Sequence, residues 1–510
     1  MLSKIFSAST VGIEARQIEI EVDIVKGLPV VIIVGLPDVA VRESRDRVRS
    51  AIKNSLFEYP CRRITINLAP CDIKKEGPCF DLPIALGILA ATGQINAKNL
   101  QDFVFLGELS LNGKVRPVKG ALPVAMSLRN SGKKFILPEK NSHEVSIVDG
   151  LEIYPSDTLN NVCDFLNGKG GLSLLRRDIT NISRAKNKNH DLDFSDVKGQ
   201  AYCKRAMEVA SAGGHNIIMV GPPGSGKTML AKRLPTIMPD MTIEESIESA
   251  KIYSVCGFSS SKKQDLSLRP FRAPHHTASD ASLVGGGSAP RPGEVSLAHN
   301  GILFMDELPE FRRNVLEALR QPMEDGYVTI SRVSNIIKFP ADFMLVCAMN
   351  PCPCGFLTDP KKECHCTPPK IQKYLSKISG PLLDRIDIHI EVPPVRYKEL
   401  SDKTSGEKSE TIKQRVEAAR KIQLGRFGNE GIFSNSQMHY KLIRKYCDLD
   451  EASQNLIKSA ITEMNFSARC YDKVIKISRT IADLEGKEKI EASHVSEAIQ
   501  YRSLDRSAWM

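Results

Sequence analysis

One octapeptide in the middle of the chain constrains its fold more than any other feature of the sequence. It has the form GxxxxGK[ST], follows directly on the apolar run Ile217–Val220, and consists of Gly221, Pro222, Pro223, Gly224, Ser225, Gly226, Lys227 and Thr228. In this pattern a strand leads into a glycine-rich turn whose backbone amides surround phosphate groups, and a helix follows. Lys227 is expected to reach the β- and γ-phosphates of a nucleotide, and the Thr228 hydroxyl to bind Mg²⁺. The octapeptide therefore predicts a P-loop in an α/β sheet, with ATP and Mg²⁺ as cofactors.

Two more apolar runs in the same segment end at polar residues. Ile302–Met305 leads to Asp306 and Glu307, and Phe343–Ala348 leads, after one methionine, to Asn350. Because the carboxyl ends of parallel strands meet at one edge of a sheet, these side chains are expected beside the P-loop. Asp306 is the expected Mg²⁺ partner, Glu307 the base that activates water, and Asn350 the group that orients this water.

An arginine lies among apolar residues further along the chain. Arg385 stands within Leu382–Asp387 and could form an ion pair with Asp384 or Asp387. It could also act as an arginine finger, which completes the ATP site of a neighbouring subunit. The second alternative implies a ring or another head-to-tail assembly.

Four cysteines form two close pairs. Cys352 and Cys354 precede Cys364 and Cys366 with nine residues between the pairs, so the four thiolates could close a tetrahedral Zn²⁺ site. The CxC spacing is less specific than CxxC, and burial of free thiols is the main alternative. Zinc at this position would stiffen the loop that follows Asn350.

Composition sets the remaining limits. A chain of 510 residues predicts two or three domains. No apolar run approaches the roughly 20 residues that span a bilayer, and the N-terminus lacks a long apolar signal segment, so we expect a cytoplasmic protein with no membrane partner. The net charge of +10 is compatible with a polyanionic partner but is weak support for one.

The N-terminal segment has a different pattern. Ile18–Ile24 and Ile64–Leu68 alternate apolar and polar residues, as half-buried strands do, and Val30–Val34 is a continuous apolar run expected to be a strand buried on both faces. Leu82–Thr92 is typical of a packed helix. Beyond it, the polar stretch Arg176–Asp191 is expected to be a solvated linker, with a DNA-binding arm as the alternative.

The motifs of the middle segment occur together with the stretch Arg269–Ser279, which reads RPFRAPHHTAS. This set resembles the magnesium-chelatase branch of the AAA+ ATPases, and with the N-terminal segment nearly all of the chain resembles the ComM/YifB family. His275 and His276 could suggest a metal, but consecutive side chains usually diverge, which favours a structural loop.

The resemblance to the ComM/YifB family implies a hexameric ATPase. ComM-like proteins are associated with DNA branch migration while naturally competent bacteria integrate incoming DNA, so the resemblance implies a DNA partner. It also implies that Arg469 is the sensor-2 arginine of a helical lid. Basic residues between the P-loop and Asp306 could line a pore or be solvated loop charges: Lys262, Lys263, Arg269, Arg272 and Arg291.

The N-terminal segment resembles the Lon protease domain without its catalytic pair. Lys75–Asp81 matches the Lon nucleophile loop and places Cys79 where Lon has serine, and Gly107–Gly120 matches the strand and turn before Lon's catalytic lysine. That lysine position falls on Leu122, which cannot accept a proton, and Lys119 is expected to point elsewhere. We therefore expect no peptidase activity.

The sequence thus predicts an α/β fold in four parts. These are a Lon-protease-like α/β domain over 1–170, a linker over 171–194, an AAA+ core with a parallel sheet over 195–395, and a helical C-terminal lid over 396–510. A DNA motor is the first functional expectation. A chelatase subunit that drives metal insertion and a protein-remodelling ATPase are the alternatives, and stimulation of ATP turnover by DNA or by unfolded protein would separate the first from the last.

Overall fold

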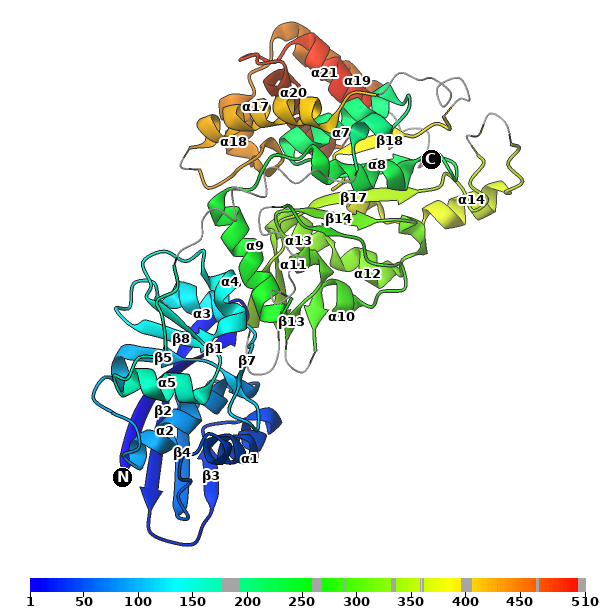
Figure 1. The fold of residues 1–510 in the computed structure, drawn as a ribbon. Helices are drawn as coiled ribbons and strands as arrows, with labels where there is room; N and C mark the ends of the chain where they lie inside the picture. The colour runs from blue at the N-terminus through cyan, green and yellow to red at the C-terminus, as the bar shows by residue number, and fades with distance from the viewer. Residues whose placement is uncertain are drawn as a thin grey trace. The chain divides into compact units, whose positions relative to one another are not determined.

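The computed structural model describes residues 1–176, 192–258, 268–287, 290–331, 336–357, 359, 362–395, 406–428, 430–464 and 467–502 (Figure 1). Most of the expected linker therefore lies outside the described residues. The chain divides into two compact units. The first comprises Met1–Lys186 and Ile243–Leu266, and the second comprises Asn187–Thr242 and Ser267–Met510.

A seven-stranded mixed sheet forms the centre of the first unit. Its strands lie in the order β3-β4-β2-β1-β5-β8-β9. Their bounds are β1 Leu2–Val11, β2 Glu14–Val25, β3 Val31–Val34, β4 Arg63–Ala69, β5 Phe103–Phe105, β8 Lys134–Pro138 and β9 Ile153–Ser156. The strands expected from the alternating patterns, β2 and β4, are confirmed and pair antiparallel.

Apolar side chains cover both faces of this sheet. Phe103 and Phe105 belong to one cluster and Val104 to another, because successive side chains of a strand point to opposite faces. The first cluster includes side chains of α1 Val39–Asn54, α2 Asp81–Ala91 and α5 Leu159–Leu166. The second includes α3 Ala121–Leu128 and α4 Ser142–Val145. The expected packed helix at Leu82–Thr92 is confirmed as α2, whereas the short strands β6 Glu108–Leu109 and β7 Val115–Arg116 form a separate hairpin.

The expectation that Val30–Val34 is buried on both faces is wrong. The segment does form β3, but β3 is the last strand of the sheet and pairs only with β4. Val30 and Val34 are 46% and 42% exposed. A continuous apolar run does not distinguish a central strand from an edge strand, because it carries no information on neighbours.

A helix from the middle of the sequence completes the first unit. α9, Ile243–Cys256, packs against α3 and buries Ala250 in the second apolar cluster (Figure 1). The Ser254 carbonyl accepts a hydrogen bond of 3.0 Å from the Gly120 amide, and the Ser254 hydroxyl accepts one of 3.3 Å from the Leu122 amide. The chain therefore leaves the second unit after the P-loop helix, adds α9 to the first unit, and returns.

The second unit is built on a parallel sheet of five strands in the order β11-β14-β17-β10-β18. All four pairs are parallel, which confirms the predicted sheet. Their bounds are β10 Ile217–Val220, β11 Phe271–Arg272, β14 Ile302–Met305, β17 Met344–Met349 and β18 Ile388–Glu391. Both faces are covered, because these strands alternate between two apolar clusters.

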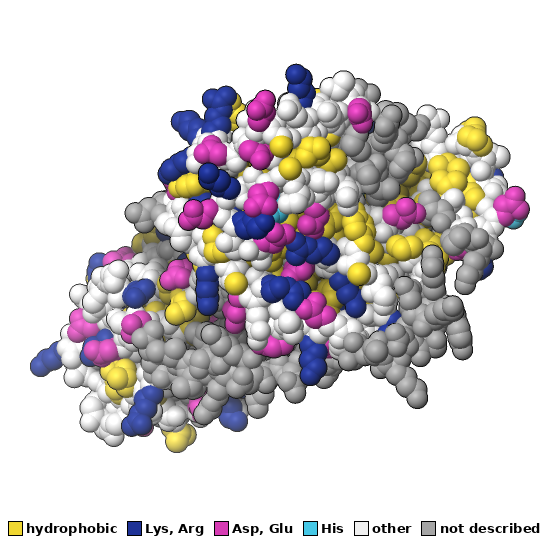
Figure 2. All heavy atoms as spheres, turned by 90° about the horizontal axis from the view of Figure 1, so that it is seen from above, with side chains coloured by type: hydrophobic (Ala, Val, Ile, Leu, Met, Phe, Trp, Pro, Cys, Tyr) yellow, Lys and Arg dark blue, Asp and Glu magenta, His cyan; other side chains and the backbone are white. Residues whose placement is uncertain are grey.

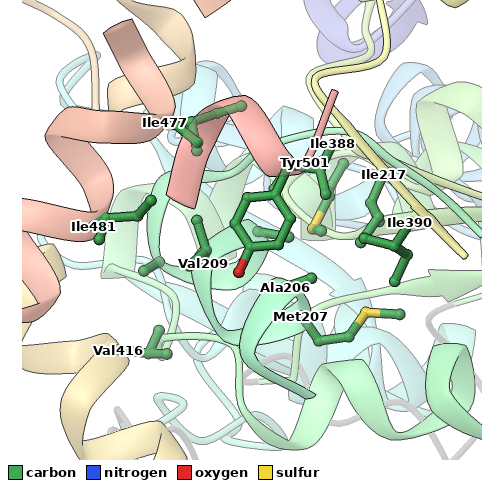
Figure 3. Packing of buried hydrophobic residues seen from close by; sticks show 14 of the residues in the cluster. Ala206, Met207, Val209, Ile217, Ile388, Ile390, Val416, Ile477, Ile481 and Tyr501 are labelled. Carbon is green, nitrogen blue, oxygen red and sulfur yellow. The ribbon is translucent and has the colours of Figure 1, made fainter. Parts of the chain in front are cut away.

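The C-terminal helices share one core with this sheet. Figure 3 shows Ile217, Ile388 and Ile390 of the sheet packing with Ile477 and Ile481 of α20, and Tyr501 lies among them. The C-terminal helices are α17 Ser409–Phe427, α18 Tyr440–Tyr446, α19 Glu451–Met464, α20 Ala468–Leu484 and α21 Ala492–Gln500. The earlier helix α7 Ala201–Gly213 packs against α17 and α20 in the same core. The predicted helical C-terminal region is confirmed, and its apolar faces bury one side of the sheet.

The second unit also contains several short helices and hairpins. They are α8 Lys227–Arg233, α10 Asp280–Leu283, α11 Glu294–Leu297, α12 Arg313–Ala318, α13 Arg320–Asp325, α14 Pro368–Leu375 and α15 Gly380–Leu383, with the hairpins β12 Gly285–Gly286 to β13 Arg291–Pro292 and β15 Tyr327–Ser331 to β16 Ile336–Pro340. Within the described part of the chain, no helix is long and apolar enough to span a bilayer.

Candidate functional site

The P-loop connects β10 to α8 at the carboxyl edge of the parallel sheet. Gly226 has φ of 94°, a left-handed conformation that glycine adopts without strain. A Cβ atom at Gly221 would lie 2.3 Å from the Val392 carbonyl oxygen, so only glycine fits beside the end of β18. The two glycines of the motif that bracket the loop are therefore fixed by backbone geometry.

Lys227 is enclosed by the loop that it follows. Its Nζ atom donates hydrogen bonds to the carbonyl oxygens of Gly221 at 2.7 Å and Pro222 at 2.9 Å, and to Oδ1 of Asn350 at 3.2 Å. Burial lowers the pKa of Lys227, and Asp306 acts in the opposite direction. The three sequence-predicted residues Lys227, Asn350 and Asp306 thus lie at one site.

Thr228 and Asp306 are in direct contact. The Thr228 hydroxyl donates a hydrogen bond of 2.8 Å to Oδ2 of Asp306, which follows β14. A threonine oxygen and a carboxylate oxygen side by side are the pair of hard ligands that Mg²⁺ uses in P-loop proteins. The residues present therefore fit a magnesium ion at this position.

Two further features belong to the P-loop region: the buried hydroxyl of Ser225, and the contact of Gln200 with the P-loop backbone. The Ser225 hydroxyl is buried in the P-loop and has no hydrogen-bond partner among the described residues, which is unusual for a buried polar group. Gln200 has φ of 53° before α7, and its Nε2 atom donates hydrogen bonds to the carbonyl oxygens of Ser225 and Pro393. Gln200 precedes the P-loop motif and belongs to no sequence pattern, so its contact with the P-loop backbone could not be predicted from the sequence.

Models of the magnesium-chelatase ChlI subunit match most of the chain. "Magnesium chelatase, subunit ChlI" covers residues 193–400, "Subunit ChlI of Mg-chelatase" covers 20–141, and "Magnesium chelatase, subunit ChlI C-terminal" covers 406–502. Competence protein ComM of Haemophilus influenzae is 43% identical over 506 residues, which are 99% of this chain and 98% of ComM. The chain belongs to the ComM/YifB family.

Other relatives agree with this assignment. YifB of Escherichia coli is 44% identical over 506 residues, which are 99% of this chain and 98% of YifB. Lon protease 2 of Bacillus subtilis is 35% identical over 97 residues, 19% of this chain and 17% of the protease. The family and the Lon-like similarity inferred from the sequence are confirmed, and with them the AAA+ type of the ATPase fold.

Glu307 stands two residues beyond β14, directly after Asp306. It has φ of 54°, and its side chain is 59% exposed. Nδ1 of His276 lies 3.4 Å from Oε2 of Glu307, while Nδ1 of His275 lies 3.0 Å from the Thr277 hydroxyl. The expectation that the two histidine side chains diverge is wrong, because their ring centroids are 4.1 Å apart.

The two predicted arginines share one acidic partner. Arg385 pairs with Glu324 of α13, and Nη2 of Arg469 lies 3.8 Å from the same carboxylate. Neither of the expected partners of Arg385, Asp384 and Asp387, forms this ion pair. Among the described residues, no hydrogen bond or ion pair joins either arginine to the P-loop of its own chain.

Two of the basic residues that could line a pore, Arg269 and Arg272, have partners within the second unit. Nε of Arg269 donates to the Pro239 carbonyl oxygen at 2.7 Å. Arg272 binds Glu294 with two hydrogen bonds of 2.6 and 2.8 Å. These contacts favour a structural role, whereas Arg291 is exposed and the two lysines of the same group, 262 and 263, lie outside the described residues.

The four cysteines that follow β17 converge. The sulfur of Cys352 lies 3.3 Å from that of Cys354 and 3.6 Å from that of Cys364, and all four ligand atoms, with Cys366, lie within 4.8 Å of one another. A disulfide would need about 2.05 Å. A tetrahedron of four sulfurs around zinc has edges of about 3.8 Å when the Zn–S bonds are about 2.3 Å. The cluster could therefore hold a metal ion.

The Lon-like position lacks a catalytic arrangement. Leu122 is fully buried, and Cys79 packs against the same apolar cluster. The Cys79 sulfur lies 3.8 Å from the Glu76 carbonyl oxygen, and burial raises the pKa of its thiol to about 12. Lys119 instead lies against Gly257, just beyond α9. A thiol of this pKa beside a leucine is a poor nucleophile.

Surface charge gives no simple binding face in the view of Figure 2. Lysine and arginine side chains are interspersed there with aspartate and glutamate side chains. The net charge of +10 is therefore not gathered into one uniform patch on the face shown.

Proposed function

We propose that this protein is an ATP-hydrolysing ring motor that acts on DNA and promotes branch migration during recombination of incoming DNA. The observation that carries the enzymatic part is the convergence of Lys227, Thr228, Asp306 and Asn350 at one edge of the parallel sheet. The similarity to a competence protein over 99% of the chain supports the DNA part.

Each residue of the site has a role in this proposal. The P-loop amides and Lys227 hold the phosphates, and Thr228 and Asp306 hold Mg²⁺. Glu307 accepts a proton from the attacking water, and Asn350 orients that water. Bound ATP would supply the γ-phosphoryl group that passes to this water with ADP as the leaving group, and bound Mg²⁺ would offset the negative charge of the phosphates.

In the proposed ring, which we take to be a hexamer, a neighbouring subunit supplies the positively charged arginine side chains that would face the phosphates of the nucleotide. Among the described residues, no hydrogen bond or ion pair joins Arg385 or Arg469 to the P-loop of their own chain, and we propose that they reach the nucleotide of a neighbouring copy. Head-to-tail packing repeats this arrangement around a closed ring. The role of Arg469 as sensor 2 rests on family resemblance.

The DNA role is tested against protein remodelling by measuring ATP turnover with each polymer. We expect single-stranded or branched DNA to stimulate turnover, and an unfolded protein such as reduced, carboxymethylated lactalbumin to leave it unchanged. Stimulation by the unfolded protein alone would replace the DNA proposal with protein remodelling. The chelatase name of the family models motivates a third arm with a magnesium–porphyrin mixture, for which we expect no response.

We further propose that the four cysteines bind structural zinc. The sulfur–sulfur distances of 3.3 to 3.6 Å support this choice, since they are close to the edges of a ZnS₄ tetrahedron. Elemental analysis of protein purified without chelators should find one zinc per chain, and a Cys352→Ser, Cys364→Ser variant should contain none. Zinc-free wild-type protein would remove the assignment.

A further inference from the structure

Glu324 joins two arginines that come from distant parts of the chain. Its Oε1 atom accepts a hydrogen bond from Nη2 of Arg385, which follows α15. The same Oε1 atom lies 3.8 Å from Nη2 of Arg469, near the start of α20. One carboxylate oxygen therefore holds both residues that the proposed function assigns to a neighbouring nucleotide.

Arg385 is not fully satisfied by these contacts. Its side chain is only 10% exposed, and Nη1 donates to the Pro381 carbonyl oxygen. Its Nε atom is buried and has no hydrogen-bond partner in the part of the chain that the structure describes. Buried donors are nearly always paired, so this guanidinium retains capacity for another acceptor.

Two guanidinium groups around one anion form an arrangement suited to phosphate. A carboxylate carries one negative charge, whereas a terminal phosphate carries more charge and offers three oxygens to the planar donors of arginine. The Glu324 side chain is 50% exposed, and the contact to the 59% exposed Arg469 is a surface ion pair of low strength. A more highly charged anion can therefore displace this carboxylate.

We propose that Glu324 holds Arg385 and Arg469 in the free subunit, and that the terminal phosphate of a nucleotide bound to a second copy takes its place. The inference rests on the proposed function, because it needs a ring in which these arginines reach the neighbouring site. Glu324 acts as a positioning residue that competes with assembly, since its carboxylate leaves before the arginines meet the phosphate.

The test is the dependence of ATP turnover on protein concentration for wild type and Glu324→Gln. The amide keeps the size of the side chain but loses its charge, so half-maximal specific activity should occur at a protein concentration roughly three- to tenfold lower. Glu324→Ala should shift the curve in the same direction. Asp325→Asn removes a charge from the adjacent exposed residue of α13 and should leave the curve unchanged.

Binding of a fluorescent ATP analogue, measured at protein concentrations below assembly, separates this inference from the proposed function. It should be equal in wild type and Glu324→Gln, because no hydrogen bond or ion pair among the described residues joins Glu324 to the P-loop of its own chain. Suppose that wild type hydrolyses ATP, but that its curve of activity against protein concentration coincides with that of Glu324→Gln or lies at lower concentration. Either result would overturn the inference and leave the proposed function standing. No turnover in wild type at any concentration would overturn the proposed function and the inference with it.

Discussion

The Thr228 hydroxyl donates a hydrogen bond of 2.8 Å to Oδ2 of Asp306, across 78 positions of sequence. This contact joins the P-loop, which follows β10, to the end of β14, two strands away in the sheet, and brings two oxygen ligands to one place. Lys227 extends the same site to Asn350.

Replacing the proposed base separates nucleotide binding from hydrolysis. Glu307→Gln should lower the rate of ATP hydrolysis by about 10²–10⁴-fold, because general-base catalysis contributes about that factor. Its affinity for ATP should stay within about threefold, since the side chain is exposed and lies outside the P-loop contacts. Steady-state turnover and equilibrium binding of labelled ATP measure the two effects.

Glu310→Gln is the matched control, because it makes the same change in an exposed ion pair with Lys377 and should retain activity. Equal losses of activity in both variants would contradict the role of Glu307.

The cysteine cluster should influence nucleotide binding through direct packing. A Cβ atom at Gly355 would lie 2.6 Å from Cδ of Pro223 and 3.7 Å from Cγ of Asn350, so this loop touches both the P-loop and the end of β17. Removing zinc should weaken Mg·ATP binding by roughly tenfold, the scale of effect seen when groups that orient a site are lost. Titration of labelled ATP into chelator-treated protein, before and after zinc is restored, measures it. Cys71→Ser, at an exposed position, is the matched control. Unchanged affinity after complete zinc removal would show that the loop is rigid without metal.

The thiol of Cys79 should resist alkylation. Because burial raises its pKa to about 12, the reactive thiolate is rare at pH 8, whereas the exposed Cys61 and Cys71 should react readily. Mass spectrometry after brief iodoacetamide treatment of the native protein reports each site. Peptide hydrolysis that is lost in Cys79→Ala would contradict the expected absence of peptidase activity.

A buried ion pair should stabilise the junction between β18 and α20. Nζ of Lys473 lies 2.9 Å from Oδ1 of Asp387, with Nδ1 of His215 at 3.5 Å from Oδ2. Asp387→Asn leaves Lys473 buried without a counter-charge and should cost about 3–5 kcal/mol. The double variant with Lys473→Met should recover most of this loss. Urea unfolding and hydrogen exchange of α20 measure both, and an equal loss in the double variant would contradict the ion-pair account.

The ion pair between Asp387 and Lys473 also predicts how the stability of the protein depends on pH. Burial opposes the charge of Asp387, but Lys473 and then His215 outweigh it, and the pKa of the carboxyl lies well below its usual range. A carboxyl with a lowered pKa in the folded protein contributes stability above its unfolded pKa of about 3.9, and this contribution is lost as the pH falls further. Asp387→Asn should therefore show a shallower loss of stability below about pH 4 than wild type. If the free energy of unfolding fell equally steeply with pH in wild type and in Asp387→Asn, this assignment would be contradicted.

The convergence of the P-loop with Asp306 and Asn350 could be predicted from the sequence, because these residues sit at fixed distances from strand ends. The P-loop, Asp306 and Asn350 each follow an apolar run, and a parallel sheet brings such positions to one edge. The edge position of β3 could not be predicted, because burial depends on which strands become neighbours. Local sequence patterns could not predict that α9 belongs to the first unit, since Ser254 meets Gly120 and Leu122 only after folding.

The contacts that lie between distant segments were missed for a related reason. Glu324 is one acid in an exposed short helix, and nothing in its neighbourhood distinguishes it from a solvated charge. Its relation to Arg385 and Arg469 depends on the packing of α13, α15 and α20. His276 likewise meets Glu307 only through the fold, although its position in the RPFRAPHHTAS stretch marks it as a candidate.

The central claim is tested most directly by branch migration of a labelled three- or four-stranded DNA junction in the presence of ATP and Mg²⁺. Wild type and Lys232→Ala, which changes an exposed lysine of α8, should both convert the junction, and Lys227→Ala should not. Conversion by the first two proteins alone would establish a DNA motor driven by the site described above. No conversion by wild type, with ATP turnover intact and unresponsive to DNA, would contradict it.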